Sequence, residues 1–211
     1  MKKILFILKK RELYGEDYAH SVSTGLLNSA SFVDDMLAES CVESKLVVVT
    51  DNNDIDREVT LYKPTHVIIE ALWVVPEKFA VLKNLHPKVT WIVRVHSEAP
   101  FLANEGMAVD WISNYINRDN IYVAVNSQRF YNNLRDIVWS RDRDKILYLP
   151  NYYPPAGVPA IKKHKERVIK VGCFGAIRPL KNQLLQAMAA IKFADDLRYH
   201  LEFHVNAGRV E

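Results

Sequence analysis

Ile4-Leu-Phe-Ile-Leu8 decides the fold of this chain, because it is an apolar run without a polar interruption. A strand that helices cover on both faces gives such a continuous run, whereas a strand with one solvated face alternates. Five further short, mainly apolar runs follow: Leu46–Val49, Val67–Ile69, Trp91–Val95, Ile121–Val125 and Ile146–Leu149. Six such strands separated by helices predict an α/β fold with a doubly wound, Rossmann-like parallel sheet over residues 1–150.

The segments between these runs have helical spacing. One buried stripe is predicted from residues at i, i+4, i+7 and i+11, namely Leu26, Ala30, Val33 and Leu37. Ser127 is placed to cap a later helix. Ligands of such sheets bind beyond the carboxyl ends of the strands, but no G-x-G-x-x-G follows the first run. We therefore expect no dinucleotide site after the first run. We also expect that the chain uses no cofactor.

Composition narrows the class of protein. The net charge of +3, from 28 basic and 25 acidic side chains, is too small to indicate a general nucleic-acid binder. Cys41 and Cys173 lie far apart, which argues against a metal site, and we expect both to be free, buried thiols of a cytoplasmic protein. No apolar stretch approaches the ~20 residues of a membrane span.

A proline-rich segment with a charged run, residues 151–167, is predicted as a linker. Lys162–Arg167 within it fits a solvated linker better than a binding patch. Alternation restarts with a strand at Val168–Phe174, a helix and a strand at Leu201–Val205. Since two strands and one helix cannot cover their own apolar faces, we expect residues 168–211 to be the start of a truncated second Rossmann-like unit. Cover by the first domain, or by a second copy in a homo-oligomer, is the alternative.

The second unit contains the stretch Val171-Gly-Cys-Phe-Gly-Ala-Ile-Arg-Pro-Leu-Lys-Asn182. It is typical of a strand, a turn at Gly175 and a helix that starts near Pro179. Lys181 would then lie beside a helix N-terminus, where backbone N–H groups favour an anion. The stretch indicates either a diphosphate site or an ordinary βα unit with a solvated lysine.

This layout resembles a GT-B glycosyltransferase of the retaining, family-4 type. The resemblance rests on a complete first domain, a Pro150-Asn151 hinge and the six-residue spacing of Gly175 and Lys181. It implies that the first domain holds the acceptor and the second holds a nucleotide-sugar, whose diphosphate Lys181 contacts. Where the family often has Arg after the glycine, this chain has Ala176, and Arg178 could supply that charge.

The resemblance also assigns candidate residues around the strand ends. A histidine at the position of His96 lies near the anomeric carbon in that family, although a histidine bonded to backbone would look the same in sequence. Glu98 is an alternative acid or base. Ser23 and Asn126 are expected on the acceptor side. Asp51 and Asp54 lack further ligands at a fixed spacing, so no metal site is expected.

The implied reaction transfers a sugar from a nucleotide-sugar to an unknown acceptor with retention. Catalysis would rest on positioning and on stabilising the leaving diphosphate, the roles of Lys181 and Arg178. The family's paired glutamates have no counterpart, so we expect this chain alone to bind nucleotide-sugars weakly or not at all, and to be inactive. Two alternatives stay open: a self-associating, non-catalytic assembly module, and a viral-type nucleobase glucosyltransferase, which would need a basic groove.

Overall fold

A computed structural model describes residues 2–10, 24–154, 167–174 and 181–205. The chain divides into two compact units, Met1–Pro154 and Pro155–Glu211. The predicted linker began at residue 151, so its first four residues fall within the first unit. Each unit is described by itself below.

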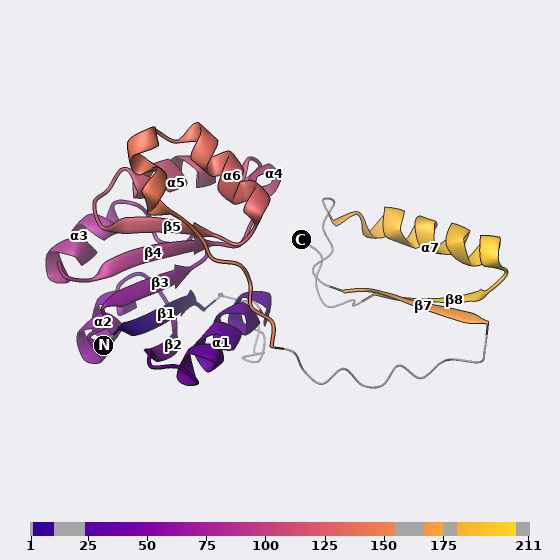
Figure 1. Cartoon of the computed structure of the whole chain (residues 1–211), viewed down its shortest axis with the longest axis horizontal. Helices are drawn as coiled ribbons and strands as arrows, with labels where there is room; N and C mark the ends of the chain where they lie inside the picture. Colours follow the sequence, from indigo (N-terminus) through magenta and orange to yellow (C-terminus); the bar gives the residue numbers. More distant parts are fainter. Residues whose placement is uncertain (1, 11–23, 155–166, 175–180, 206–211) are drawn as a thin grey trace. The chain divides into compact units, whose positions relative to one another are not determined.

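The first unit is built on a six-stranded parallel sheet of the predicted Rossmann-like class (Figure 1). Its strands are β1 (Lys3–Lys9), β2 (Glu43–Val49), β3 (His66–Glu70), β4 (Thr90–Val95), β5 (Ile121–Val125) and β6 (Ile146–Tyr148). Their spatial order is β2-β1-β3-β4-β5-β6, and every neighbouring pair is parallel. The prediction of an α/β parallel sheet is confirmed, and all carboxyl ends lie at one edge.

Helices lie on both faces of this sheet. They are α1 (Thr24–Ala38), α2 (Asp54–Tyr62), α3 (Lys78–Leu85), α4 (Ala99–Leu102), α5 (Ala108–Ile116), α6 (Gln128–Ile137) and the 3-10 helix η2 (Ser140–Lys145). The predicted cap of α6 is present, because the Ser127 hydroxyl accepts a hydrogen bond of 3.1 Å from the Phe130 N–H. Right-handed crossovers place α1 on the face opposite the helices that follow β2, since the strand order reverses at β1.

The larger core lies between the sheet and the helices that follow β2. Trp91 of β4, Phe79 of α3 and Tyr115 of α5 are fully buried there, and the Phe79 ring packs edge-on against both other rings. The Tyr115 hydroxyl donates a hydrogen bond to the Val74 carbonyl oxygen. Burial raises the pKa of that hydroxyl, because ionisation would place a charge in the core.

A smaller cluster lies on the α1 face. Phe6 of β1 and Ile68 of β3 pack there with Val33 of α1, and Tyr152 packs against them. The Tyr153 ring meets the Phe32 ring at 6.1 Å between centroids. The chain after β6 is therefore held on the α1 side of the sheet by aromatic contacts.

The second unit consists of β7 (Val168–Cys173), α7 (Gln183–Leu197) and β8 (His200–Val205), with β7 and β8 parallel. α7 covers the apolar face of this pair, where Cys173 Sγ lies 3.2 Å from Gln186 Oε1. The opposite face is polar and includes a Lys170–Glu202 ion pair of 2.8 Å. That ion pair lowers the pKa of Glu202, mainly through the hydrogen bond from Lys170.

Two details concern expectations from composition. Both cysteines are free and Cys173 is buried as expected, but Cys41 is exposed in the turn after α1, so its expected burial was wrong. Within the described ranges, the helices are too short or too polar to cross a membrane.

The aromatic core yields a stability prediction. Phe79→Ala should lower the free energy of unfolding by about 3–5 kcal/mol, because it removes a fully buried ring and leaves a cavity. Val81→Ala, at a half-exposed position of the same helix, should change it by less than about 0.5 kcal/mol. Urea denaturation of both variants is the measurement, and equal losses would contradict this account of the core.

Candidate functional site

Two opposite charges are buried together at the carboxyl ends of β3 and β4. Glu70 and Arg94 stand opposite each other in the parallel register, and their side chains are fully buried. Arg94 Nη1 donates to Glu70 Oε1 at 3.2 Å. A buried charge is tolerated when it is paired and hydrogen-bonded. Each of these two side chains therefore compensates the buried charge of the other.

His96 follows β4 directly and completes the pairing of Glu70. Its Nε2 lies 2.5 Å from Glu70 Oε2, while the imidazole remains 13% exposed. Because a carboxylate only accepts hydrogen bonds, Nε2 carries the proton in the neutral ring. Nδ1 is then the nitrogen that can accept a proton or a hydrogen bond from a ligand. Glu70 thus orients an accessible histidine at the sheet edge where ligands bind in this fold class.

The backbone after β3 is strained at the same place. Ala71 has a φ of 72°, a left-handed conformation that costs a non-glycine residue about 1–2 kcal/mol. Its N–H donates to the Arg94 carbonyl at 2.9 Å, and the Trp73 indole N–H donates to the Glu70 carbonyl at 3.0 Å. These bonds fix the turn that follows Glu70. Strain held by surrounding contacts is typical of functional sites.

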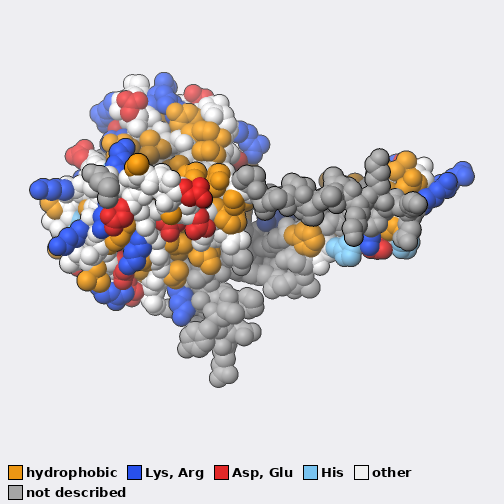
Figure 2. Space-filling model, turned by 60° about the horizontal axis from the view of Figure 1, so that its bottom comes forward, with side chains coloured by type: hydrophobic (Ala, Val, Ile, Leu, Met, Phe, Trp, Pro, Cys, Tyr) orange, Lys and Arg blue, Asp and Glu red, His pale blue; other side chains and the backbone are white. Residues whose placement is uncertain are grey.

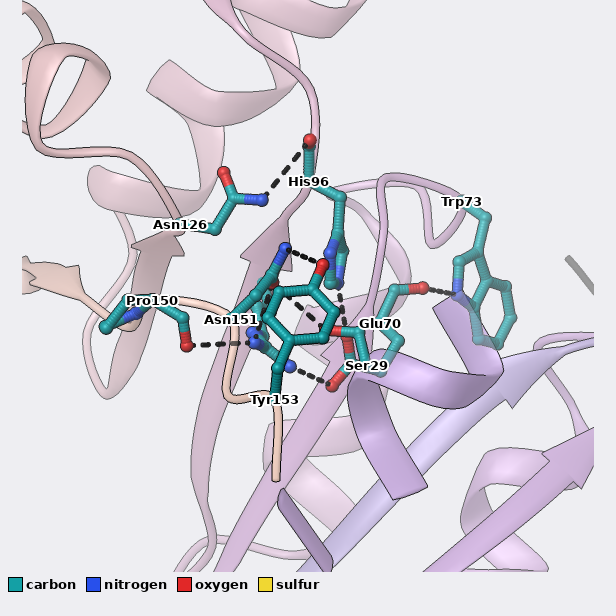
Figure 3. Close-up of polar contacts among 9 residues, drawn as sticks. Ser29, Glu70, Trp73, His96, Asn126, Pro150, Asn151 and Tyr153 are labelled. Atoms are coloured by element: carbon teal, nitrogen blue, oxygen red, sulfur yellow. Dashed lines mark hydrogen bonds and ion pairs between the residues drawn. The ribbon is translucent and has the colours of Figure 1, made fainter. Parts of the chain in front are cut away.

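The chain after β6 supplies further partners for Arg94. Arg94 Nη2 lies 3.2 Å from Asn151 Oδ1 and 3.4 Å from the Pro150 carbonyl oxygen. The Ser29 hydroxyl of α1 donates to the same Asn151 oxygen at 3.0 Å. Figure 3 shows Ser29, Pro150 and Asn151 beside Glu70 and His96. Arg94 Nε has no hydrogen-bond partner among the described residues.

The structure brings some of the predicted site residues together. Asn126, after β5, points its amide Nδ2 at the His96 carbonyl oxygen at 3.5 Å (Figure 3). Glu98 instead forms a 3.3 Å ion pair with Arg129 of α6 and is one-third exposed. Ser23 lies outside the described residues. His96 and Asn126 therefore share one place at the sheet edge, whereas Glu98 is directed toward α6.

The predicted donor residues belong to the second unit. Gly175 and Arg178 lie outside the described residues. Lys181 is exposed and stands two residues before α7, and its carbonyl accepts a 2.7 Å hydrogen bond from Gln186. α7 begins at Gln183, and the predicted helix start near Pro179 lies outside the described residues.

The loop after β2 is organised by its own carboxylate. Asp54 Oδ2 accepts hydrogen bonds from the Thr50 N–H at 2.9 Å and the Asp51 N–H at 3.3 Å. These bonds, with Arg57 nearby, lower the pKa of Asp54. Lys78 Nζ donates to Asn53 Oδ1 at 2.9 Å. The loop thus serves as the start of α2.

Sequence reasoning missed Glu70, Arg94 and Ser29, and it assigned Asn151 only to a hinge. A signal was present: Arg94 interrupts a run that is otherwise apolar and expected to be buried on both faces. A cation at such a position requires a nearby acceptor, and Glu70 ends the neighbouring run. Glu70 and Arg94 become partners only because β3 and β4 are adjacent in the sheet, and the apolar runs alone do not show which strands are adjacent.

Comparison with known proteins adds no relative. No protein-family model matches the chain, and no curated protein matches its sequence.

Over the part of the chain that the structure describes, no group of three or more His, Cys, Asp or Glu side chains could hold a metal ion. Basic and acidic side chains are interspersed on the face of the first unit in Figure 2.

The buried pair yields a second prediction. Glu70→Gln should lower the free energy of unfolding by about 3–5 kcal/mol, because it leaves the Arg94 charge buried without a counter-charge. The double variant Glu70→Leu/Arg94→Leu should lose less, since it removes both charges. Glu77→Gln, at an exposed position, is the matched control and should lie near the parent protein. A double variant as unstable as Glu70→Gln in urea denaturation would contradict this account.

Proposed function

We propose that this chain is a retaining glycosyltransferase of the GT-B type, or the acceptor-side part of one, that uses a nucleotide-sugar donor. The observation that carries the proposal is His96, accessible at the carboxyl end of a central strand and held by the buried Glu70–Arg94 pair. The first unit would hold the acceptor and the second would contact the donor.

The orientation of His96 supports a positioning role. With Nε2 donating to Glu70, Nδ1 can accept a hydrogen bond from a sugar hydroxyl. Retaining transfer of this type lets a donor phosphate oxygen take the acceptor proton, so the histidine orients the sugar and supplies no nucleophile. Asn126, whose side chain approaches the His96 carbonyl, offers an amide oxygen and donor suited to a further hydroxyl. Fixed placement of the reacting groups can account for a large share of such a rate enhancement.

The second unit supports the donor side of the proposal. Lys181 is an exposed cation two residues before α7. In the proposed complex it would contact the diphosphate together with Gly175 and Arg178, the two predicted donor residues that lie outside the described residues. Negative charge grows on the diphosphate as the sugar leaves, so a cation placed there stabilises the transition state more than the ground state.

NMR titration of the chain with UDP-, GDP- and ADP-sugars tests the proposal. We expect weak binding of one of them, seen as shifts of the backbone amide signals around Lys181 that the nucleoside alone does not produce. Lys181→Ala should abolish these shifts, because it removes the cation that would contact the diphosphate.

Lys192→Ala is the matched control for this titration. Lys192 is also an exposed lysine of the second unit, but it lies on α7 in an ion pair with Asp196 of 3.2 Å. Its replacement should leave the shifts intact. Absence of shifts near Lys181 with all three donors, or an equal loss in both variants, would contradict the proposal.

A self-associating assembly module is the second candidate, favoured by the surface of α7. Leu184, Met188 and Ile191 are each more than half exposed and follow one another at i, i+4 and i+7 on this helix. An apolar stripe of this kind marks a contact surface when another element covers it. We propose that a second copy of the chain covers it.

Molar mass in solution tests this candidate. The parent chain should form a dimer or larger species, and Met188→Glu should shift it to monomer, because a charge would be buried at the contact. Leu61→Glu, at a 71% exposed apolar position of the first unit, should not change the mass. Light scattering after gel filtration gives the masses, and a monomeric parent chain would contradict self-association.

A further inference from the structure

We propose that Asn151 and Arg94 are positioning residues for His96. Through them and Glu70, the segment Pro150–Tyr153, which packs on the α1 face, influences the protonation of the His96 imidazole. This inference rests on the proposed function for the use of His96, but its test requires no sugar. It assigns a role to a segment that the sequence indicated only as a hinge and the start of a linker.

The first step is the anchoring of the segment. The Ser29 hydroxyl of α1 donates to Asn151 Oδ1 at 3.0 Å. Tyr152 packs against the cluster of Phe6 and Ile68, and Asn151 Nδ2 lies 3.5 Å from the Tyr153 hydroxyl. Asn151 is therefore held at a fixed place on the α1 face by its own amide and by the two residues that follow it in the chain.

The second step runs through the guanidinium group. Arg94 Nη2 faces Asn151 Oδ1 and the Pro150 carbonyl, whereas Arg94 Nη1 faces Glu70 Oε1. The guanidinium is planar and rigid, so its two ends move together. A shift of Asn151 therefore changes the distance between Arg94 and Glu70.

The third step is the sharing of one carboxylate. Glu70 uses Oε1 for Arg94 and Oε2 for His96, and its side chain is fully buried. When the guanidinium approaches, it compensates more of the Glu70 charge, and less of that charge acts on the imidazole. When it withdraws, Glu70 favours the protonated imidazole more strongly. The Glu98–Arg129 ion pair is the other charged pair next to this strand end.

The segment stands at the end of the first unit. The first unit ends at Pro154, directly after these residues, and Lys181 belongs to the second unit. The segment is therefore the last part of the first unit before the chain continues toward the unit that contains Lys181.

The variant Asn151→Asp tests the inference. It preserves the size of the side chain and adds a carboxylate against Arg94 Nη2, which draws the guanidinium away from Glu70. We expect the titration midpoint of the His96 ring, followed by ¹⁵N NMR, to move upward by roughly half a pH unit or more. The Nε–H signal of Arg94 should shift in the same variant.

Asn126→Asp is the matched control. It adds the same charge beside His96, where Asn126 approaches the His96 carbonyl, but it does not contact Arg94 in the structure. It should move the His96 midpoint by direct attraction and leave the Arg94 signal in place. In an Arg94→Lys background, the effect of Asn151→Asp should fall by more than half, because a lysine cannot span Glu70 and Asn151 together.

Two results would overturn the inference. One is a His96 midpoint that Asn151→Asp leaves unchanged. The other is an upward shift without movement of the Arg94 signal, or of equal size in the Arg94→Lys background. If Arg94→Lys does not fold, the Arg94 signal in the two single variants decides. Failure of the nucleotide-sugar titration would count against the proposed function and leave this coupling intact.

Discussion

The buried ion pair between Arg94 and Glu70 is the constraint on which the carboxyl edge of the sheet depends. Neither charge could stay in the interior alone, because desolvating an unpaired ion costs several kcal/mol. The pair itself uses Glu70 Oε1 and Arg94 Nη1. The second carboxylate oxygen contacts His96, and the second terminal nitrogen of the guanidinium contacts the Pro150–Asn151 segment. One interaction thus determines where a strand end, a histidine and the departing chain meet.

The parallel topology makes this meeting possible. β3 and β4 are neighbours in the sheet, yet 24 positions separate Glu70 from Arg94 in sequence. All strands end at the same edge, so polar residues at their carboxyl ends gather there without any local sequence motif. The middle of each strand contributes to the apolar core, and the polar side chains stand at the carboxyl ends.

The strands of the first unit could be predicted because burial on both faces is a local signal. Ile4–Leu8 and Ile121–Val125 are visible as apolar runs, and Ser127 is recognisable as a cap from its own neighbours. The site could be predicted only in part. His96 follows a strand and was found, but its partner Glu70 depends on strand order. The role of Asn151 depends on where the chain runs after β6, and Cys41 is exposed because its turn ends α1.

The Glu70–Arg94 pair also restricts how β3 and β4 can align with each other. If β4 slipped by one residue against β3, Val93 or Val95 would face Glu70, and both charges would be buried without partners. Two apolar side chains at these positions would add no such electrostatic penalty to the slip. The pair therefore fixes the register of the two strands, and only this register brings the His96 imidazole to the second oxygen of Glu70. Specificity of the fold and orientation of the candidate histidine follow from one placement of charge.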